Sequence, residues 1–164
     1  MSIAYRVQDY IAEHDVPWDV LPHFASQSSM EAARLAHVPP DRVAKAVVLE
    51  DDEGYFVAVI PANRRLDLPQ LGDALGQHLT LASERALGEL FADCVQGAVP
   101  AVGDAYGLPT LWDSSLGDMP DVYFEGGDRR SFVHMSGGDF CELMRLALPL
   151  RPASHMGAEA SLPG

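Results

Sequence analysis

The fold is decided by two neighbouring stretches of the chain, VAKAVVLE at residues 43–50 and YFVAVIP at residues 55–61. Both are dominated by β-branched and other apolar residues, as buried strands are. The segment between them, DDEG at residues 51–54, combines acidic residues with a glycine and is typical of a tight turn. The sequence therefore predicts a β-hairpin over residues 43–61.

Shorter elements flank this hairpin. Ser28 and Glu31 form a capping box, which predicts a helix over residues 28–36. Helical and extended segments do not alternate regularly, so we predict an α+β domain over residues 1–148 with a largely antiparallel or mixed sheet. The tail, residues 149–164, is expected to be mobile. Further helices are predicted at residues 2–14, 69–75, 83–90 and 136–146, and further strands at residues 18–21, 66–68, 79–81, 110–113, 122–125 and 132–135.

The composition limits the possible classes of protein. With 48% hydrophobic and 21% charged residues, the chain is too apolar to be disordered. It has no run of the ~18 apolar residues that a membrane helix needs, and its first residues lack a secretory signal. We therefore expect a cytoplasmic protein. The formal net charge of −13 argues against a protein that clamps long nucleic acids, so any contact with RNA should be small and local.

Metal and cofactor motifs are missing from the sequence. The six histidines show no ligand spacing, so we expect no metal. Cys94 and Cys141 stand far apart without a CxxC pair, and we expect both to be buried apolar residues rather than a disulfide. Neither a serine-hydrolase elbow nor a phosphate-binding loop occurs. The sequence predicts no cofactor.

Lys45 is the only lysine of the chain. Strand alternation places it on one face with Val43, Val47 and Leu49, which is a costly position for a charge. It can be interpreted as an edge-strand lysine, whose stem lies on apolar surface while the ammonium reaches water. It can also be interpreted as a functional lysine. The residues alone slightly favour the first interpretation.

Two glycine segments allow similar alternatives. Gly97, Ala98, Val99 and Pro100 lie in a long irregular loop, where a glycine lets backbone N–H groups approach a ligand. The simpler interpretation is an ordinary turn. Gly126-Gly127 follows the predicted strand at residues 122–125, and by itself it is typical of a hairpin turn.

Taken in order, RVAKAVVLED, YFVAVIPANRRLDL, LASERALGELF, QGAVPAVG and DVYFEGGDRRSFVHMSGGDF resemble the YbaK and prolyl-tRNA synthetase-associated domain family over about residues 16–146. The resemblance implies an α+β domain built round a closed, barrel-like, mostly antiparallel sheet. It also implies a cytoplasmic hydrolase that deacylates mischarged tRNA, in many relatives tRNA for proline carrying a small noncognate amino acid. The implied partners are therefore mischarged tRNA and prolyl-tRNA synthetase.

The resemblance also assigns roles to residues. It makes Lys45 the favoured catalytic residue, with the backbone N–H groups of Gly97 and Ala98 stabilising the developing oxyanion. The remaining implied residues surround the substrate: Trp18, Ala46, Val99, Pro100, Gly126, Gly127 and Arg129.

Three departures from the family pattern bear on specificity. Ala101 replaces a second proline, Ala46 replaces a common polar residue, and Arg129 stands near where some relatives have a histidine. One alternative function is therefore a non-catalytic member that binds aminoacyl-tRNA or a synthetase. Another is the hydrolysis of simpler acyl esters.

Overall fold

The structure is a computed structural model that describes residues 3–150 and 156–158. In it, β2 (Val43–Glu50) and β3 (Tyr55–Pro61) form the predicted hairpin. The two strands pair antiparallel along their length. The Asp51 carboxylate accepts the N–H groups of Glu53 and Gly54 at 2.8 and 3.0 Å, which closes the turn. The hairpin is therefore confirmed, and local side-chain chemistry sets its turn.

Around the hairpin lies a mixed eight-stranded sheet, with the order β1-β8-β7-β2-β3-β6-β9 and with β5 paired to β2. The ladders β1–β8, β8–β7, β2–β3 and β2–β5 are antiparallel, and the other three are parallel. The α+β class is confirmed. Within the described residues no ladder joins β1 to β9, so strand pairing does not produce the expected closure. The remaining strands of this sheet are β1 (Asp19–Pro22), β5 (Thr80–Leu81), β6 (Thr110–Asp113), β7 (Asp121–Glu125), β8 (Ser131–Ser136) and β9 (Leu148–Leu150).

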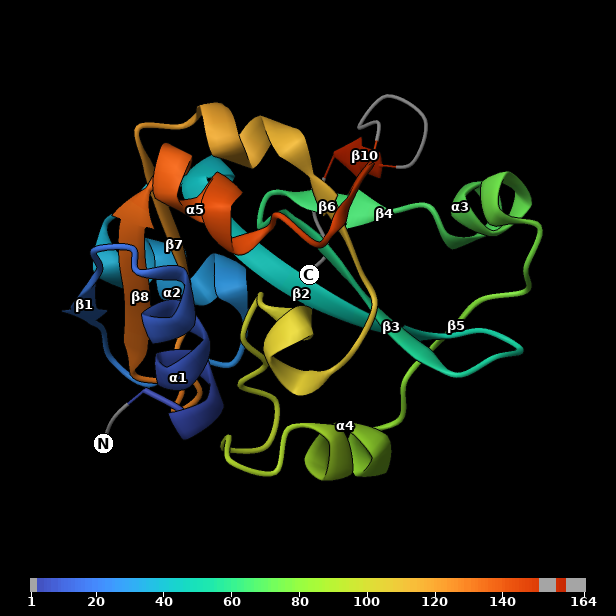
Figure 1. Ribbon diagram of the computed structural model, residues 1–164, viewed down its shortest axis with the longest axis horizontal. Coiled ribbons are helices and arrows are strands. Elements are labelled where there is room, and N and C mark those ends of the chain that lie inside the picture. Colours follow the sequence, from blue (N-terminus) through green and yellow to red (C-terminus); the bar gives the residue numbers. More distant parts are fainter. Residues whose placement is uncertain (1–2, 151–155, 159–164) are drawn as a thin grey trace.

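Helices cover the sheet from several sides. Figure 1 shows α1 and α2 beside β1, β8 and β7, with α3 at the opposite end of the molecule. In the part of the chain that the structure describes, no helix has the length and apolarity needed to cross a membrane. The α-helices are α1 (Tyr5–His14), α2 (Ser29–Ala36), α3 (Leu68–Leu75), α4 (Glu84–Leu90) and α5 (Gly137–Leu143), and the short 3-10 helices are η1 (Pro40–Arg42), η2 (Gly103–Tyr106) and η3 (Ser114–Asp118).

Side-chain caps fix where several helices begin. The Ser28 hydroxyl accepts the Glu31 N–H at 3.1 Å, and the Glu31 carboxylate accepts the Gln27 N–H at 2.7 Å. Ser83 caps α4 in the same way, by accepting the Ala86 N–H. Because such caps satisfy N–H groups that the helix itself leaves without partners, both predicted helix starts are confirmed.

The two faces of β2 pack against different parts of the core. Ala44 and Val48 join the largest apolar cluster, which includes buried residues of α1 and α5. On the other face, Val43 packs in a cluster with α2, and Leu49 packs in a cluster with α3. Lys45 lies on this second face, between the two smaller clusters.

The edge of β2 that faces away from β3 is paired at its two ends. β7 pairs with Val43 and Ala44, whereas β5 pairs with Leu49 and Glu50. The Val48 carbonyl, which faces this edge, accepts the Ala82 N–H at 2.9 Å. By strand alternation the backbone N–H and C=O of Ala46 face the same edge, in the interval between β7 and β5. The sheet is therefore split at the position of Lys45 and Ala46.

The sheet extends past the predicted tail boundary. Pro149 lies inside β9, which pairs in parallel with β6, so the sheet continues through Leu150. β10 (Met156–Ala158) pairs antiparallel with β4 (Arg64–Leu66). The other tail residues, 151–155 and 159–164, lie outside the described residues, so the predicted mobility is not tested there.

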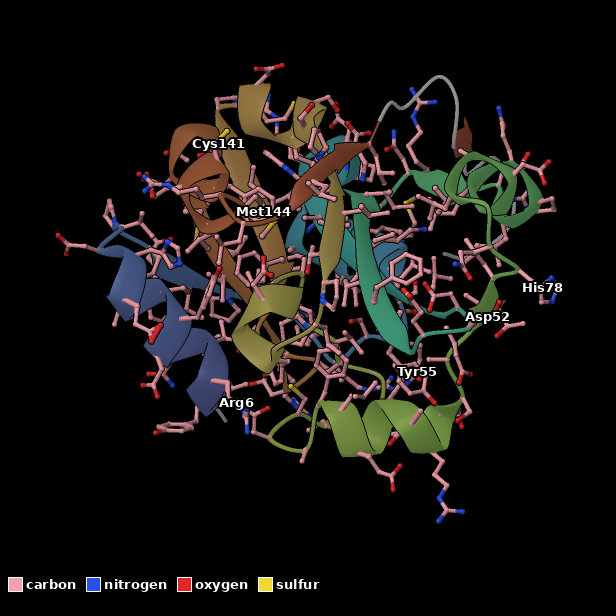
Figure 2. All side chains as sticks on the ribbon, turned by 45° about the vertical axis from the view of Figure 1, so that its right-hand side comes forward. Arg6, Asp52, Tyr55, His78, Cys141 and Met144 are labelled. Carbon is pink, nitrogen blue, oxygen red and sulfur yellow. The ribbon has the colours of Figure 1, made fainter. Side chains whose placement is uncertain are left out.

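The prediction that both cysteines are buried is wrong. Cys141 is exposed and Cys94 is intermediate, and both are free thiols. Figure 2 shows Cys141 near the outside of the molecule and Met144 further inside. Burial raises the pKa of the Cys94 thiol to about 12, so the thiol is protonated at neutral pH and is a weak nucleophile.

Candidate active site

A cavity of about 180 Å³ opens where the sheet is split. Its floor is β2, from Lys45 to Val48, and its walls come from segments far apart in the sequence. One wall is the chain that leads into α2, residues 26–29. The other walls are α4 through Leu87, the irregular loop through Gly97 and Val99, and the end of β7 with the following turn.

Lys45 is 6% exposed and lines this cavity. Burying an ammonium group costs free energy unless polar or anionic groups surround it. Glu125 lines the same cavity, so the site contains charges of both signs. Burial and position therefore favour a functional lysine over an edge-strand lysine whose ammonium reaches bulk water.

Arg129 ties two walls of the cavity together. Its Nε donates to the Gln96 carbonyl at 2.7 Å, and its Nη2 donates to the same oxygen. Its Nη1 donates to the Gln27 side-chain oxygen at 2.8 Å and to the Ser26 carbonyl at 3.3 Å. Through these hydrogen bonds the guanidinium holds the loop at Gln96 against the segment at Ser26 and Gln27.

Gly97 is required by this arrangement. Its φ of +85° lies in the left-handed region, which favours glycine. A Cβ at this position would collide with the Arg129 guanidinium. The glycine therefore allows the arginine to reach the Gln96 carbonyl and holds the loop against the cavity.

Glu125 is held by the turn that follows it. Its Oε2 accepts the N–H groups of Gly127 at 3.1 Å and Arg129 at 3.0 Å. Burial raises the pKa of this carboxyl group, and the two N–H groups only partly oppose the shift. A carboxylate in the cavity is therefore anchored by one oxygen and poorly solvated.

His23 lies behind Glu125 and is buried. Its Nδ1 is 2.7 Å from the Phe24 carbonyl, so Nδ1 carries a proton. Its Nε2 is 3.9 Å from Glu125 Oε1, which is beyond hydrogen-bond length. Within the described residues, this Nε2 has no hydrogen-bond partner.

The structure brings together five of the ten residues assigned to the site by resemblance. Those that line the cavity are Lys45, Ala46, Gly97, Val99 and Arg129. Ala98 and Pro100 are buried in the loop behind it. The Ala98 N–H donates to the Val95 carbonyl at 2.9 Å, so this N–H is already engaged within the loop.

The glycine pair supports the site without lining it. A Cβ on Gly126 would collide with Ile3, and one on Gly127 would lie 3.0 Å from the Ala4 side chain. These glycines therefore let the segment before α1 pack against the turn. Through its N–H group, Gly127 also holds Glu125.

Trp18 lies elsewhere. It borders a different hollow, together with Asp19 and His134, and it packs against the main core. The prediction that Trp18 lines the opening of the Lys45 cavity is therefore not met. Two residues that the sequence did not single out, Glu125 and His23, lie in or directly behind the cavity. The only local signal was a glutamate placed directly before the glycine pair.

In the described part of the chain, no three histidine, cysteine, aspartate or glutamate side chains lie close enough together to hold a metal ion. The groups available for chemistry at the cavity are therefore a lysine, a carboxylate, a guanidinium and backbone N–H groups. Such groups can bind an ester and its charges and can orient a water molecule.

Similarity to solved structures extends over most of the chain. A protein described as a candidate trans-editing enzyme for prolyl-tRNA synthetase is 24% identical, with a TM-score of 0.75 over 88% of this chain and 92% of that chain. A protein described only as hypothetical is 22% identical, with a TM-score of 0.76 over 93% and 99% of the two chains. A candidate signal transduction protein from Marinobacter aquaeolei is 23% identical, with a TM-score of 0.72 over 95% of this chain but 31% of that protein. At these identities, the structures establish a shared fold.

Sequence comparison identifies the family. Residues 24–143 match the profile described as the aminoacyl-tRNA editing domain. The match includes β2, the loop that contains Gly97, the turn after Glu125 and all of α5, and so contains every wall of the cavity. This chain therefore belongs to the aminoacyl-tRNA editing domain family, as its resemblance to the YbaK group predicts.

Proposed function

We propose that this protein hydrolyses the ester bond of mischarged tRNA at the Lys45 cavity. The substrate would be tRNA for proline carrying a small noncognate amino acid. The observation that carries the proposal is a buried lysine in a cavity of about 180 Å³, held between a glycine loop and an arginine-tied turn. Family membership supports the reaction class.

The reaction needs no covalent intermediate with the protein. Water attacks the ester carbonyl carbon, and the bond to the ribose oxygen then breaks. The water supplies a proton to that oxygen and a hydroxyl to the amino acid. In this mechanism the Lys45 ammonium binds the ester or terminal phosphate oxygen, where negative charge develops or is already present. Because Ala98 donates elsewhere, Gly97 and Ala46 are the backbone segments beside the reacting group.

Such an enzyme would act as a second sieve. One methylene in an apolar pocket discriminates by only ~1–3 kcal/mol, so a synthetase also accepts smaller amino acids. A small cavity would admit these and exclude the larger, correct one. With a net charge of −13, contact with tRNA would be confined to the acceptor end, and prolyl-tRNA synthetase is the proposed partner in the cytoplasm.

A panel of charged tRNAs tests the proposal. We expect the purified protein to release a small amino acid from tRNA for proline, and to leave correctly charged prolyl-tRNA intact. Release from simple amino acid esters alone would instead support a general esterase. Binding of charged tRNA without any release would support the non-catalytic function, which the alanines at positions 46 and 101 favour.

A further inference from the structure

The Glu125 turn gives the cavity a carboxylate whose two oxygens have different surroundings. Oε2 is held by the N–H groups of Gly127 and Arg129. Oε1 points away from these donors, towards His23 Nε2 at 3.9 Å. Glu125 also lines the cavity, which places a negatively charged residue beside a bound ligand.

His23 lies next to this carboxylate. Because its Nδ1 donates to the Phe24 carbonyl, Nε2 is the ring nitrogen that lies nearest Glu125. This nitrogen is buried and has no hydrogen-bond partner among the described residues. A buried carboxylate that is held through one oxygen, in a place of low solvation, creates a local negative potential.

The proposed substrate carries a group that fits this potential. An aminoacyl ester has an α-ammonium group one carbon away from the ester carbonyl. In a small cavity the Lys45 ammonium would repel this group, whereas a carboxylate would attract it. Lys45 and Glu125 therefore have the charges needed to orient the ester, one at its oxygen and the other at its amine.

We propose that Glu125 accepts the α-ammonium group of the aminoacyl ester, so that the site selects free amino acid esters over N-acylated ones. This inference rests on the proposed function, since it names how that site recognises its substrate. An N-acylated amino acid has lost the positive charge that this carboxylate would attract.

Matched substrates test this assignment. The two substrates are tRNA for proline carrying alanine and tRNA for proline carrying N-acetylalanine, which differ only at the amine. We expect wild type to prefer the free amine by roughly 100-fold or more in kcat/KM, as a site with a dedicated polar partner does. Glu125→Gln keeps an oxygen that can accept the two N–H groups. It should lower kcat/KM for the free amine by about 10- to 100-fold and leave the acetylated substrate within about 3-fold, so the preference collapses.

Glu89→Gln provides the control, because it removes the same charge from an exposed position on α4. It should keep the full preference. Equal losses on both substrates in Glu125→Gln would show a general structural role and overturn the assignment, as would an unchanged preference.

A binding measurement separates this inference from the proposed function. The probe is adenosine with alanine attached through a stable 3′-amide, compared with its N-acetylated form. Tighter binding of the free amine by wild type, lost in Glu125→Gln, supports the assignment even if no tRNA is hydrolysed. Equal affinity of wild type for both probes contradicts it even if deacylation is efficient.

Discussion

Two histidines of this protein sit beside carboxylates, and their surroundings differ. His134 lies between Asp19 and Asp121, with Nδ1–Oδ1 and Nε2–Oδ1 distances of 2.6 and 2.8 Å. Its ring also stacks on Tyr123 at 4.7 Å between centroids. His23 has one ring nitrogen satisfied, and its other nitrogen is 3.9 Å from Glu125.

The difference separates a structural cluster from a binding site. Both nitrogens of His134 have partners, and the cluster joins β1, β7 and β8. At His23, Nε2 has no hydrogen-bond partner among the described residues, and the neighbouring Glu125 borders a cavity. Changes in the cavity should therefore reduce activity more than stability, whereas changes at His134 should do the reverse.

The largest effect is expected for Lys45→Ala. Loss of the ammonium removes the charge that stabilises the ester oxygen, and comparable losses reduce rates by about 10²–10³-fold. Single-turnover deacylation measures this, and circular dichroism checks the fold. Arg34→Ala is the control, because it removes an exposed cation from α2 outside the cavity. A similar loss in the control would point to charge in general rather than to Lys45.

A smaller but substantial effect is expected for Gly97→Ala. The added Cβ displaces Arg129 and strains a residue with a φ of +85°. We expect a loss of about 1–3 kcal/mol in unfolding free energy and at least a tenfold fall in kcat/KM. Gly76→Ala is the matched control for Gly97→Ala. Gly76 has a similar left-handed φ of +68°, but nothing lies within 4 Å of the added Cβ. It should lose stability alone, and a comparable fall in its activity would refute the loop's specific role.

These two residues show how far sequence reasoning reaches. Alternation predicts which face of β2 Lys45 occupies, and local capping predicts the starts of α2 and α4. The sequence alone cannot show that Gly97 meets Arg129, because the two residues are far apart along the chain. Arg129 reaches this loop by donating to the carbonyl of Gln96, 33 residues before it. The split in the sheet is equally hidden, since it depends on how far β7 and β5 extend along β2.

Several residues that the resemblance assigned to the site do not line the cavity, and their positions depend on tertiary contacts. Gly126, Gly127 and Ala98 make packing or turn contacts that need tertiary structure to be seen. Trp18 packs against the main core and away from the split. His23 and Glu125 are 102 residues apart, and only the pairing of β1 with β8, beside β7, brings them together.

A modest effect on stability is expected for His134→Gln. The substitution removes at least one of the two hydrogen bonds to carboxylates, and each such bond contributes roughly 1–2 kcal/mol or less at a partly exposed site. Urea unfolding measures the loss. The rate of deacylation should stay within about twofold of wild type, because His134 lies outside the cavity. A large fall in rate with unchanged stability would reverse the distinction between the two histidines.

The smallest expected effect is the pH dependence of the stability that the His134 cluster contributes. Burial acts to lower the pKa of His134, but the hydrogen bonds to Asp121 and Asp19 outweigh it, and the pKa is raised. The folded protein therefore holds the proton more tightly than the unfolded chain. This stabilisation is complete below about pH 6.5, the unfolded value, and is lost as the pH rises through the folded pKa.

Because solvent screens the partly exposed cluster, the change should stay below about 1 kcal/mol. Unfolding free energies of wild type and His134→Gln between pH 5.5 and 8.5 test it. Arg42, 3.7 Å from Asp121, and Tyr123 are present in both proteins and cancel in the comparison. A wild-type stability that rises with pH relative to the variant would contradict the sign.

The central claim is that the charged end of tRNA binds beside Lys45, and the sequence offers a direct test. Lys45 is the only lysine, so labelling with ¹³Cε-lysine gives a single NMR signal from a side chain. Titration with the alanyl 3′-amide of adenosine should shift this signal saturably, with the dissociation constant that calorimetry gives for the same probe. Tight binding by calorimetry with an unmoved lysine signal would place the substrate elsewhere and contradict the account.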